Sequence, residues 1–478
     1  MSVLGHLEPK KVFSFFEEMC AIPHGSRNNT AISNWLVQFA VDRGLEYYQD
    51  DAENVIIIKP ATPGYEAVEP VIIQGHMDMV CEKAADCAKD MAKEGLDLAV
   101  DGDMIYAKGT TLGGDDGIAV AMGLALLDST DVAHPRLEVV ITTDEELGMD
   151  GAVALDASVL QAKRMLNIDS EDEGVFTVSC AGGASGKVVV PVKREGFTGA
   201  VATLSVEGLA GGHSGVEIHK GRANADMLLG RVLYAAAAKT ALRIVSVDGG
   251  LKDNAIPTAA KAIVCVENIE VLRQVCAEMD TVLRSEHAVT DPGVRVSVCD
   301  GGNGVAMDEM STRHVTSLLT CAPDGVQVMS ADIEGLVQTS LNLGVLYTQE
   351  DQVVASFCIR SSVDSQKMML LDRLQALAWL LGGEYVISGV YPGWAYRQES
   401  PLRDLMTEVF VQQYGHEPKV EAIHAGLECG LFAGKIPGLD CVSFGPDLYE
   451  IHTPRERMSI SSVQRSWTFL VELLRRMK

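Results

Sequence analysis

Acidic and histidine residues follow several short apolar segments of this sequence. His76 and Asp78 end the segment VIIQGHMD, three acids at 144–146 follow LEVVITT, and Asp169 follows MLNI. Continuous apolarity of this kind is typical of strands that are buried on both faces of an α/β sheet. Ligands of such sheets bind at the carboxyl ends of the strands, so we expect these polar side chains to share one site.

The first two of these motifs each have two interpretations when considered alone. His76 and Asp78 point the same way on an extended backbone, so the carboxylate can orient a metal-binding imidazole, but a surface histidine is the alternative. Asp115 and Asp116 in TTLGGDDGIA precede an alanine-rich helix expected at 116–128. They can cap that helix, or one carboxylate can bridge two metal ions.

The three adjacent carboxylates of Asp144, Glu145 and Glu146 repel one another unless a cation lies among them. Adjacent residues on an extended backbone point to opposite sides, so Glu145 and Glu146 are expected to have different roles. One would bind a metal, and the other would face a metal-bound water. A solvated acidic loop is the alternative.

His452, in DLYEIHTPRERMS, completes the set, although a lone histidine is more often structural. Two imidazoles and three carboxylates, with one further glutamate, suit a pair of zinc ions that each keep a position for water. The water between the ions would be acidified toward neutrality and deprotonated by the spare glutamate. Histidine ligands disfavour calcium, and the sequence has no EF-hand spacing.

The composition excludes several classes of partner. The chain has 478 residues, of which 66 are acidic and 39 basic, giving a formal net charge of −27. Such a charge repels nucleic acid and anionic membranes, so we expect neither as a partner. The eleven cysteines are scattered and include no C-x-x-C pair, which indicates reduced thiols. Because there is neither a signal peptide nor an apolar run of ~18 residues, we expect a cytoplasmic protein.

The sequence predicts an α/β fold in which one domain interrupts another. A glycine-rich hinge, AGGASG at 181–186, precedes a segment in which helices at roughly 222–238, 267–284, 308–321 and 364–381 alternate with strands. We therefore expect a first domain formed by 1–185 and 396–478. An α+β domain would be inserted at 186–395, and its two stretches of similar content could be an internal duplication.

Six motifs together point to a known family. GHMDMV, GGDDG, DEELGMDGA, NIDSED, GGHSG and IHTPRE resemble those of the co-catalytic zinc exopeptidases, which include tripeptidase T, carnosinases and desuccinylases. The resemblance covers essentially the full length and is greatest to the dipeptidases of the family. It implies a three-layer α/β catalytic domain with the inserted segment as its lid. It also implies hydrolysis of unblocked dipeptides, Xaa-His types included, by a water that bridges two zinc ions.

The resemblance assigns a role to each metal ligand. His76 and Asp169 would bind one zinc ion, and Glu146 and His452 would bind the other. Asp115 would bridge the two ions, and the peptide bond that follows it would be cis.

Other residues are implied to act on the substrate. Asp78 would orient the first histidine ligand, and Glu145 would be the general base. His213 in the lid would stabilise the oxyanion. In many relatives this histidine comes from a partner subunit, so the resemblance allows a homodimer, and the sequence leaves open which subunit supplies it.

Three further residues are implied to contact the substrate. Asn254 and Arg360 lie in the expected lid, and Arg360 is suited to a terminal carboxylate because it can donate two parallel hydrogen bonds. Glu428, in HAGLECG, would meet a free α-amine, and an exposed acid without a partner is the alternative.

Two other functions are compatible with these motifs. An N-acyl amino acid deacylase or desuccinylase would use the same two-metal site, and a non-catalytic scaffold would keep the metals alone. Glu145 argues against the scaffold, because metal binding needs no spare base. Cobalt or manganese could replace zinc, and the sequence does not rank the dipeptides.

Overall fold

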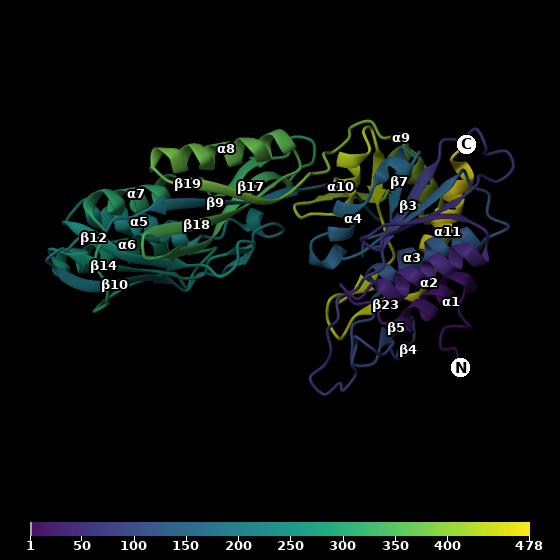
Figure 1. The fold of residues 1–478 in the computed structure, drawn as a ribbon, viewed down its shortest axis with the longest axis horizontal. Coiled ribbons are helices and arrows are strands. Elements are labelled where there is room, and N and C mark those ends of the chain that lie inside the picture. The colour runs from purple at the N-terminus through teal and green to yellow at the C-terminus, as the bar shows by residue number, and fades with distance from the viewer. Residues whose placement is uncertain (1) are drawn as a thin grey trace. The chain divides into compact units, whose positions relative to one another are not determined.

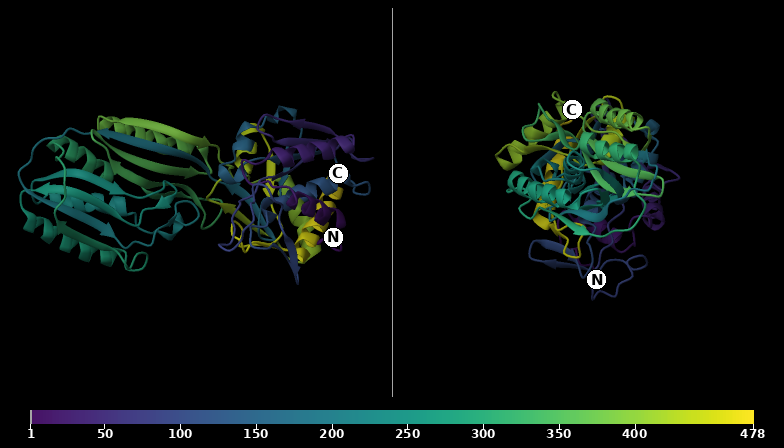
Figure 2. Two further views of the ribbon diagram at one scale, coloured as in Figure 1. Left: turned by 60° about the horizontal axis from the view of Figure 1, so that its bottom comes forward. Right: turned by 90° about the vertical axis from the view of Figure 1, so that its left-hand side faces the viewer.

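The computed structural model describes residues 2–478, which divide into two compact units. Unit 1 comprises the residues up to Ser179 with Tyr396–Ala422 and Leu427–Lys478, and unit 2 comprises Cys180–Ala395 and Ile423–Gly426. Both ends of the described chain therefore belong to unit 1 (Figure 2). The domain boundaries expected from the sequence stay a prediction, because compactness does not show that either unit folds alone.

Unit 1 is built on an eight-stranded mixed sheet. β3, β6 and β7 run parallel, and β21 runs parallel to β7, so the carboxyl ends of these strands share one edge. Their segments are almost continuously apolar because they are buried along nearly their whole length. Across the sheet the strands are β1 (Glu46–Gln49), β2 (Val55–Lys59), β6 (Leu137–Thr142), β3 (Val71–His76), β7 (Arg164–Asn167), β21 (Asp440–Ser443), β8 (Val175–Cys180) and β20 (Lys419–Ile423).

Helices cover both faces of this sheet (Figure 1). Gly75 of β3 faces α3 (Gly114–Asp128), since a Cβ atom on this glycine would lie 2.6 Å from Ala119 of that helix. The preceding residue, Gln74, donates a hydrogen bond to Glu428 at the start of α10 (Glu428–Lys435). Successive strand residues point to opposite faces, so α3 and α10 lie on opposite faces and the expected three layers are confirmed.

Other elements complete unit 1. A small sheet of β4, β5, β23 and β22 fixes both ends of the loop at 450–456. Its strands are β4 (Leu98–Asp101), β5 (Met104–Ala107), β22 (Leu448–Tyr449) and β23 (Arg457–Ser459). The other helices include α1 (Lys10–Cys20), α2 (Thr30–Asp42), α4 (Asp150–Ala154), α9 (Pro401–Tyr414) and α11 (Ile460–Arg476).

Unit 2 contains one large sheet in which two halves have the same topology. The first half is β10 (Ala200–Glu207), α5 (Ala225–Ala237), β12 (Leu242–Gly249), β14 (Ala260–Val266), α6 (Ile269–Glu286) and β15 (Arg295–Asp300). The second half is β9 (Gly182–Pro191), α7 (Glu309–Cys321), β17 (Val337–Thr348), β18 (Gln352–Ser361), α8 (Asp364–Leu380) and β19 (Glu384–Tyr391).

In each half the strands lie in the order fourth, first, third, second, counted along the chain. The two second strands, β12 and β17, pair antiparallel where the halves meet. The first half is inserted directly after β9, the first strand of the second half. This shared and nested topology supports the internal duplication that the sequence suggested.

The four long helices of unit 2 share one hydrophobic core with its sheet (Figure 1). Buried side chains such as Val188 and Val190 alternate along β9 with exposed ones such as Lys187, so the helices cover one face of the sheet. Within residues 2–478 no helix combines the length and the apolarity needed to cross a membrane.

The prediction of a hinge at 181–186 is wrong. Residues 182–186 belong to β9 and pair with β18. Glycine is needed there because aromatic side chains pack against the strand. A Cβ atom on Gly183 would lie 2.5 Å from the Tyr391 ring, and one on Gly186 would lie 2.3 Å from the Tyr385 hydroxyl. The glycines therefore permit close packing and do not mark a flexible segment.

Candidate metal centre

The predicted metal ligands lie at one edge of the unit 1 sheet. His76 is the last residue of β3, and Asp169 follows the end of β7 by two residues. Glu146 follows β6, and Asp115 lies in the first turn of α3. His452 lies in the loop between β22 and β23. The parallel strands therefore bring together residues that are distant in the sequence.

Asp115 lies between the two histidines. Its Oδ1 atom is 3.3 Å from His76 Nε2, and its Oδ2 atom is 3.1 Å from His452 Nε2. Glu146 Oε1 lies 2.9 Å from His452 Nε2, and Asp169 Oδ1 lies 3.7 Å from His76 Nε2. Each imidazole therefore faces one oxygen of the shared carboxylate and has a second acid of its own.

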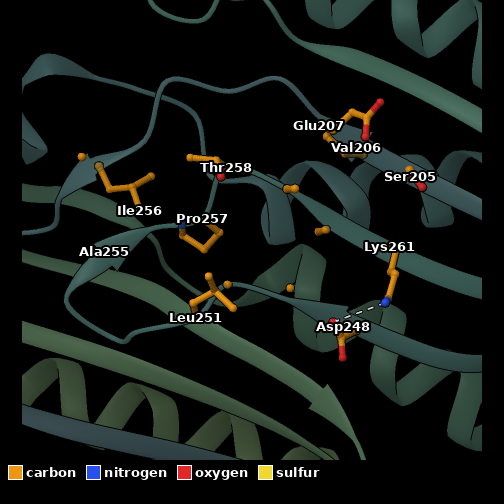
Figure 3. A pocket seen from close by; sticks show the side chains of 15 residues that line it. Ser205, Val206, Glu207, Asp248, Leu251, Ala255, Ile256, Pro257, Thr258 and Lys261 are labelled. Atoms are coloured by element: carbon orange, nitrogen blue, oxygen red, sulfur yellow. Dashed lines mark ion pairs between the residues drawn. The ribbon is translucent and has the colours of Figure 1, made fainter.

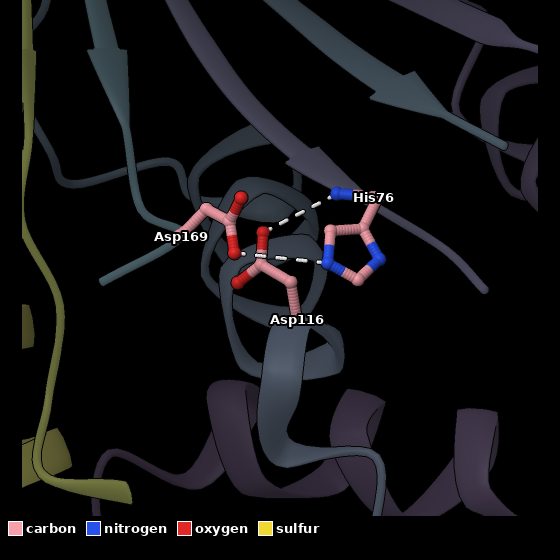
Figure 4. Close-up of side chains that lie close together, drawn as sticks. All are labelled: His76, Asp116 and Asp169. Atoms are coloured by element: carbon pink, nitrogen blue, oxygen red, sulfur yellow. Dashed lines mark hydrogen bonds and ion pairs between the residues drawn. The ribbon is translucent and has the colours of Figure 1, made fainter. Parts of the chain in front are cut away.

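The chemistry of these donors fits divalent metal ions. Nitrogen and oxygen donors in mixed groups suit zinc and other first-row divalent ions. Within residues 2–478, three groups have donor atoms within 4.8 Å of one another: His76 with Asp116 and Asp169 (Figure 4), His76 with Glu145 and Glu146, and Asp115 with Glu146 and His452.

The electrostatics of the cluster also favour a cation. Hydrogen bonds to Asp115 and Glu146 raise the pKa of His452 to about 10. Burial raises the pKa of Asp169 to about 6, and burial raises the pKa of Glu145 well above its usual range. Partly buried carboxylates that are crowded in this way repel one another, and a divalent cation between them would relieve the repulsion.

Asp116 holds the backbone of His76, the first predicted histidine ligand, a role that the sequence did not suggest. Its Oδ2 atom accepts a hydrogen bond of 3.2 Å from the backbone N–H of His76 (Figure 4). The side chain is buried, and burial raises its pKa well above the ordinary value. The Asp115–Asp116 peptide bond is cis, as the resemblance implied.

Asp78 orients His76 mainly through its backbone. His76 Nδ1 lies 3.0 Å from the carbonyl oxygen of Asp78 and 3.5 Å from its Oδ1 atom. The carboxylate accepts hydrogen bonds from the Ser26 hydroxyl at 2.8 Å and from the Glu145 N–H at 3.1 Å. This carboxylate therefore ties the first ligand to the strand end that carries Glu145.

The two adjacent glutamates lie in a short 3₁₀ helix, η1 (Glu145–Leu147), and not on the extended backbone assumed from the sequence. Successive side chains of a 3₁₀ helix are about 120° apart, because it has three residues per turn. Glu146 contacts His452, and both glutamates have a carboxylate oxygen within 4.8 Å of a His76 nitrogen. The hydrogen bond to His452 thus distinguishes Glu146 from Glu145, and the different roles expected for the two stay a prediction.

Glu428 is fully buried, so the alternative of an exposed acid is wrong. Its Oε2 atom accepts hydrogen bonds from Thr142 Oγ1 at 2.7 Å and from Gln74 Nε2 at 2.5 Å. Its Oε1 atom has no hydrogen-bond partner within residues 2–478, and burial raises the pKa of the carboxyl to about 7. A contact with a substrate amine would require this side chain to become accessible.

Unit 2 brings the predicted lid residues into a second cluster. His213 lies in β11 (Gly212–His213), which pairs with β13 (Ala255–Ile256), and the adjacent Ser214 N–H donates to the Asn254 carbonyl. Asn254 is exposed. A Cβ atom on Gly215 would lie 2.9 Å from the His213 ring and 3.1 Å from Arg360 Nε. His213 and Arg360 therefore both lie against the same face of Gly215.

Arg360 is a nearly buried cation beside two neutral histidines. It is 8 % exposed, and its Nε atom has no hydrogen-bond partner in the described part of the chain. Burial, and secondly the guanidinium charge, lower the pKa of His213 and lower that of His424 to about 3. His424, which the sequence analysis did not single out, is 2.7 Å from the Ser340 hydroxyl through Nε2. This cluster suits an anionic group of a ligand.

A cavity of about 630 Å³ lies beside the ribbon that carries His213 (Figure 3). Its lining includes Gly212, Ala255 and Ile256 of the ribbon, together with Leu251 and Pro257. The predicted site residues are not among the described residues that line this cavity. The cavity is therefore distinct from both clusters. The roles of the individual site residues stay predictions.

The chain matches known peptidases over nearly its whole length. Residues 72–476 match the model of peptidase family M20/M25/M40. The sequence is 38 % identical over 480 residues to the cytosol non-specific dipeptidase of Escherichia coli strain K12, with 99 % of each chain covered. It is 25 % identical over 267 residues to the uncharacterized protein YqjE of Bacillus subtilis, covering 52 % of this chain and 63 % of that protein.

Solved structures agree with this match. The aminoacylhistidine dipeptidase of Vibrio alginolyticus superposes with a TM-score of 0.94 at 37 % identity, covering 99 % of this chain and 97 % of that chain. The aminopeptidase PepT of Bacillus cereus gives a TM-score of 0.57 at 16 % identity, covering 98 % and 99 %, which shows a shared fold alone. The family resemblance and the expected fold class are confirmed, and the chain belongs to peptidase family M20/M25/M40.

Proposed function

We propose that this protein is a cytoplasmic dipeptidase that uses two divalent metal ions to hydrolyse unblocked dipeptides, Xaa-His types included. The observation that carries the proposal is the position of Asp115, whose two oxygens face the imidazoles of His76 and His452. The names of the Escherichia coli and Vibrio alginolyticus relatives support the substrate class, and the former also supports the compartment.

The proposed ligands follow the contacts around Asp115. His76 and Asp169 would hold one ion, Glu146 and His452 would hold the other, and Asp115 would hold both. Zinc suits two imidazoles with three carboxylates, and cobalt or manganese has similar preferences. When bound, the ions would polarise the scissile carbonyl and lower the pKa of a water molecule.

Glu145 is the proposed general base. Its pKa is raised by burial, and a carboxylate with a raised pKa can both accept a proton from water and return it near neutral pH. It would take the proton of the attacking water and give it to the leaving amine. Asp78 would position it, because the Asp78 carboxylate accepts the backbone N–H of Glu145.

Residues of unit 2 are proposed to bind the substrate. His213 Nδ1 accepts hydrogen bonds from the N–H groups of Gly215 and Val216, at 3.1 and 3.2 Å. The proton of the neutral ring therefore lies on Nε2, from which it can be donated to an oxyanion. Arg360 would bind the terminal carboxylate, and Asn254 would hydrogen-bond the substrate from its exposed loop.

Metal analysis combined with a substrate panel on the purified protein tests the proposal. We expect two divalent ions per chain, rapid hydrolysis of Ala-His and other free dipeptides, and little turnover of N-acetyl or N-succinyl amino acids. Preferential cleavage of the N-acyl compounds would instead identify a deacylase, and metal binding without turnover would identify a scaffold. Light scattering of the same sample would test for the homodimer.

A further inference from the structure

A buried carboxylate joins the two segments that supply Asp115 and His452. Glu456 is 3 % exposed and lies four residues after His452. It is the last residue of the loop between β22 and β23. Its two oxygens accept hydrogen bonds from four successive backbone N–H groups, those of Leu112, Gly113, Gly114 and Asp115, at 2.7, 3.2, 2.8 and 3.4 Å.

The backbone at 112–115 is shaped to receive this carboxylate. Gly113 has a φ of 67° and a ψ of 31°, the left-handed conformation, which allows successive N–H groups to converge on one anion. A Cβ atom on Gly114 would lie 3.3 Å from Glu456 Oε1, so the loop and the carboxylate are in close contact. The two glycines of the GGDDG motif thus form part of a concave backbone surface that binds the Glu456 carboxylate.

The other side of Glu456 is also fixed. Its backbone N–H donates a hydrogen bond of 3.0 Å to the carbonyl of Thr453, next to His452. Within the same loop Arg455 forms an ion pair of 2.6 Å with Glu450. The side chain of Glu456 therefore connects a rigid loop that carries one predicted ligand to the loop that carries the bridging one.

We infer that Glu456 is a positioning residue of the metal centre, which sets the place of Asp115 relative to His452 without touching the metal ions itself. The inference rests on the proposed metal-dependent function. Asp115 and His452 are 337 residues apart in the chain, yet their side chains are 3.1 Å apart. Without the Glu456 carboxylate the buried N–H groups at 112–115 would lose their acceptor, and the loop would shift to find another.

The test replaces this carboxylate by an amide. In the Glu456→Gln variant an NH₂ group takes the place of one oxygen and faces backbone donors, so part of the anchor becomes repulsive. Residues that orient metal ligands typically change metal affinity by about 10–100-fold when they are replaced. We expect zinc affinity of the folded apoprotein, measured by competition with a chromophoric chelator, to fall by at least about tenfold.

Glu138→Gln is the matched control. Glu138 is also fully buried and also accepts backbone N–H groups, those of Gln161 and Ala162, but it lies at the start of β6, away from the strand end that leads to Glu146. The control should lose stability in circular dichroism melts while its zinc affinity changes by less than about threefold, because it orients no metal ligand.

Several results would overturn the inference. Unchanged zinc affinity of folded Glu456→Gln would do so, and so would an equal loss of affinity in Glu138→Gln, which would indicate a general effect of stability. If Glu456→Gln does not fold, Glu456→Asp, whose carboxylate is retracted by one methylene, is measured against the same criteria. Wild-type protein that binds no divalent ion would overturn the proposed function as well, so the two failures are distinguishable.

Discussion

Glu145 and Glu146 are adjacent in the chain, yet within residues 2–478 only Glu146 lies within hydrogen-bond distance of a predicted histidine ligand. Glu146 lies 2.9 Å from His452 Nε2, whereas the backbone of Glu145 is held by the carboxylate of Asp78. In the proposed reaction the two glutamates would have different roles: Glu146 would bind metal, and Glu145 would transfer protons.

Glu145→Gln should therefore remove turnover and keep the metals. An amide cannot accept the proton of water, and general bases typically contribute about 10²–10⁴-fold to a rate. We expect kcat for Ala-His to fall within that range while the metal content stays near that of the wild type. Glu146→Gln is the comparison, since it should lose metal. Near-normal turnover of Glu145→Gln would refute the assignment of the base.

The sequence predicted those site residues that can be recognised from their residue type and their place after a strand. His76 and Asp169 stand out because they follow apolar strand segments. The positioning roles of Asp116 and Glu456 gave no such signal, because their partners are backbone N–H groups, which every residue type except proline carries. Their roles depend on which loop meets which carboxylate, and only the folded chain shows this.

At the scale of elements, the pattern of apolar residues predicted the helices and strands that pack in uniformly apolar surroundings. The helix predicted at 364–381 is α8 apart from one C-terminal residue, and the helix predicted at 116–128 is α3 apart from two N-terminal residues. β17 was not predicted, because it carries buried polar side chains such as Ser340 and Asn342. These find partners from other elements, His424 and the Asp253 carbonyl, that the local sequence does not reveal.

A second prediction concerns stability and rests on the close packing of tyrosine side chains against β9. A methyl group on Gly186 would meet the Tyr385 hydroxyl at 2.3 Å, so Gly186→Ala should destabilise unit 2 by about 1–3 kcal/mol. Tyr385→Phe removes that hydroxyl, which has no hydrogen-bond partner within residues 2–478. The double variant should therefore recover part of the loss in urea unfolding. Strictly additive effects in this double-mutant cycle would contradict the close contact.

A third prediction concerns the pH dependence of stability and rests on Asp324, which precedes β16 (Gly325–Met329) in unit 2. Burial raises its pKa to about 7, although the Leu343 N–H and Asn224 donate hydrogen bonds to it. The unfolded chain loses this proton near pH 4, so it binds fewer protons than the folded chain between about pH 4 and 7. The free energy of unfolding should therefore fall as the pH rises through this window.

Asp324→Asn cannot ionise and keeps an oxygen for the Leu343 N–H. We expect it to match the wild type near pH 4 and to exceed its stability by about 2–4 kcal/mol at pH 8. Urea unfolding of both proteins at several pH values, with the difference taken at each, isolates this group from the others that titrate. A difference that is constant with pH would show that the carboxyl of Asp324 is not perturbed.

For the whole molecule, the excess of acidic residues links metal binding to stability. The formal net charge is −27, and the acids of the candidate metal centre are partly buried and close together. Chelation should leave their repulsion uncompensated. At free metal about 100-fold above its dissociation constant, binding contributes about 2.7 kcal/mol, so removing the metal should lower Tm by several degrees.

Asp115→Asn provides the control for that fourth prediction, because it lacks the carboxylate that faces both histidines. Its melting temperature should respond little to chelator. Scanning calorimetry with and without chelator compares the two proteins. A wild-type Tm that does not change on chelation would show that the metals contribute nothing to the stability of the fold.

The nested halves of unit 2 also have a consequence for biosynthesis. β9 leaves the ribosome before the whole first half, but its partners β18 and β19 are translated only after that half is complete. All strands and helices of the first half are therefore synthesised before either sheet neighbour of β9 exists. A nascent chain stopped before β17 would therefore expose the edges of an apolar strand, which makes β9 a segment open to aggregation during synthesis.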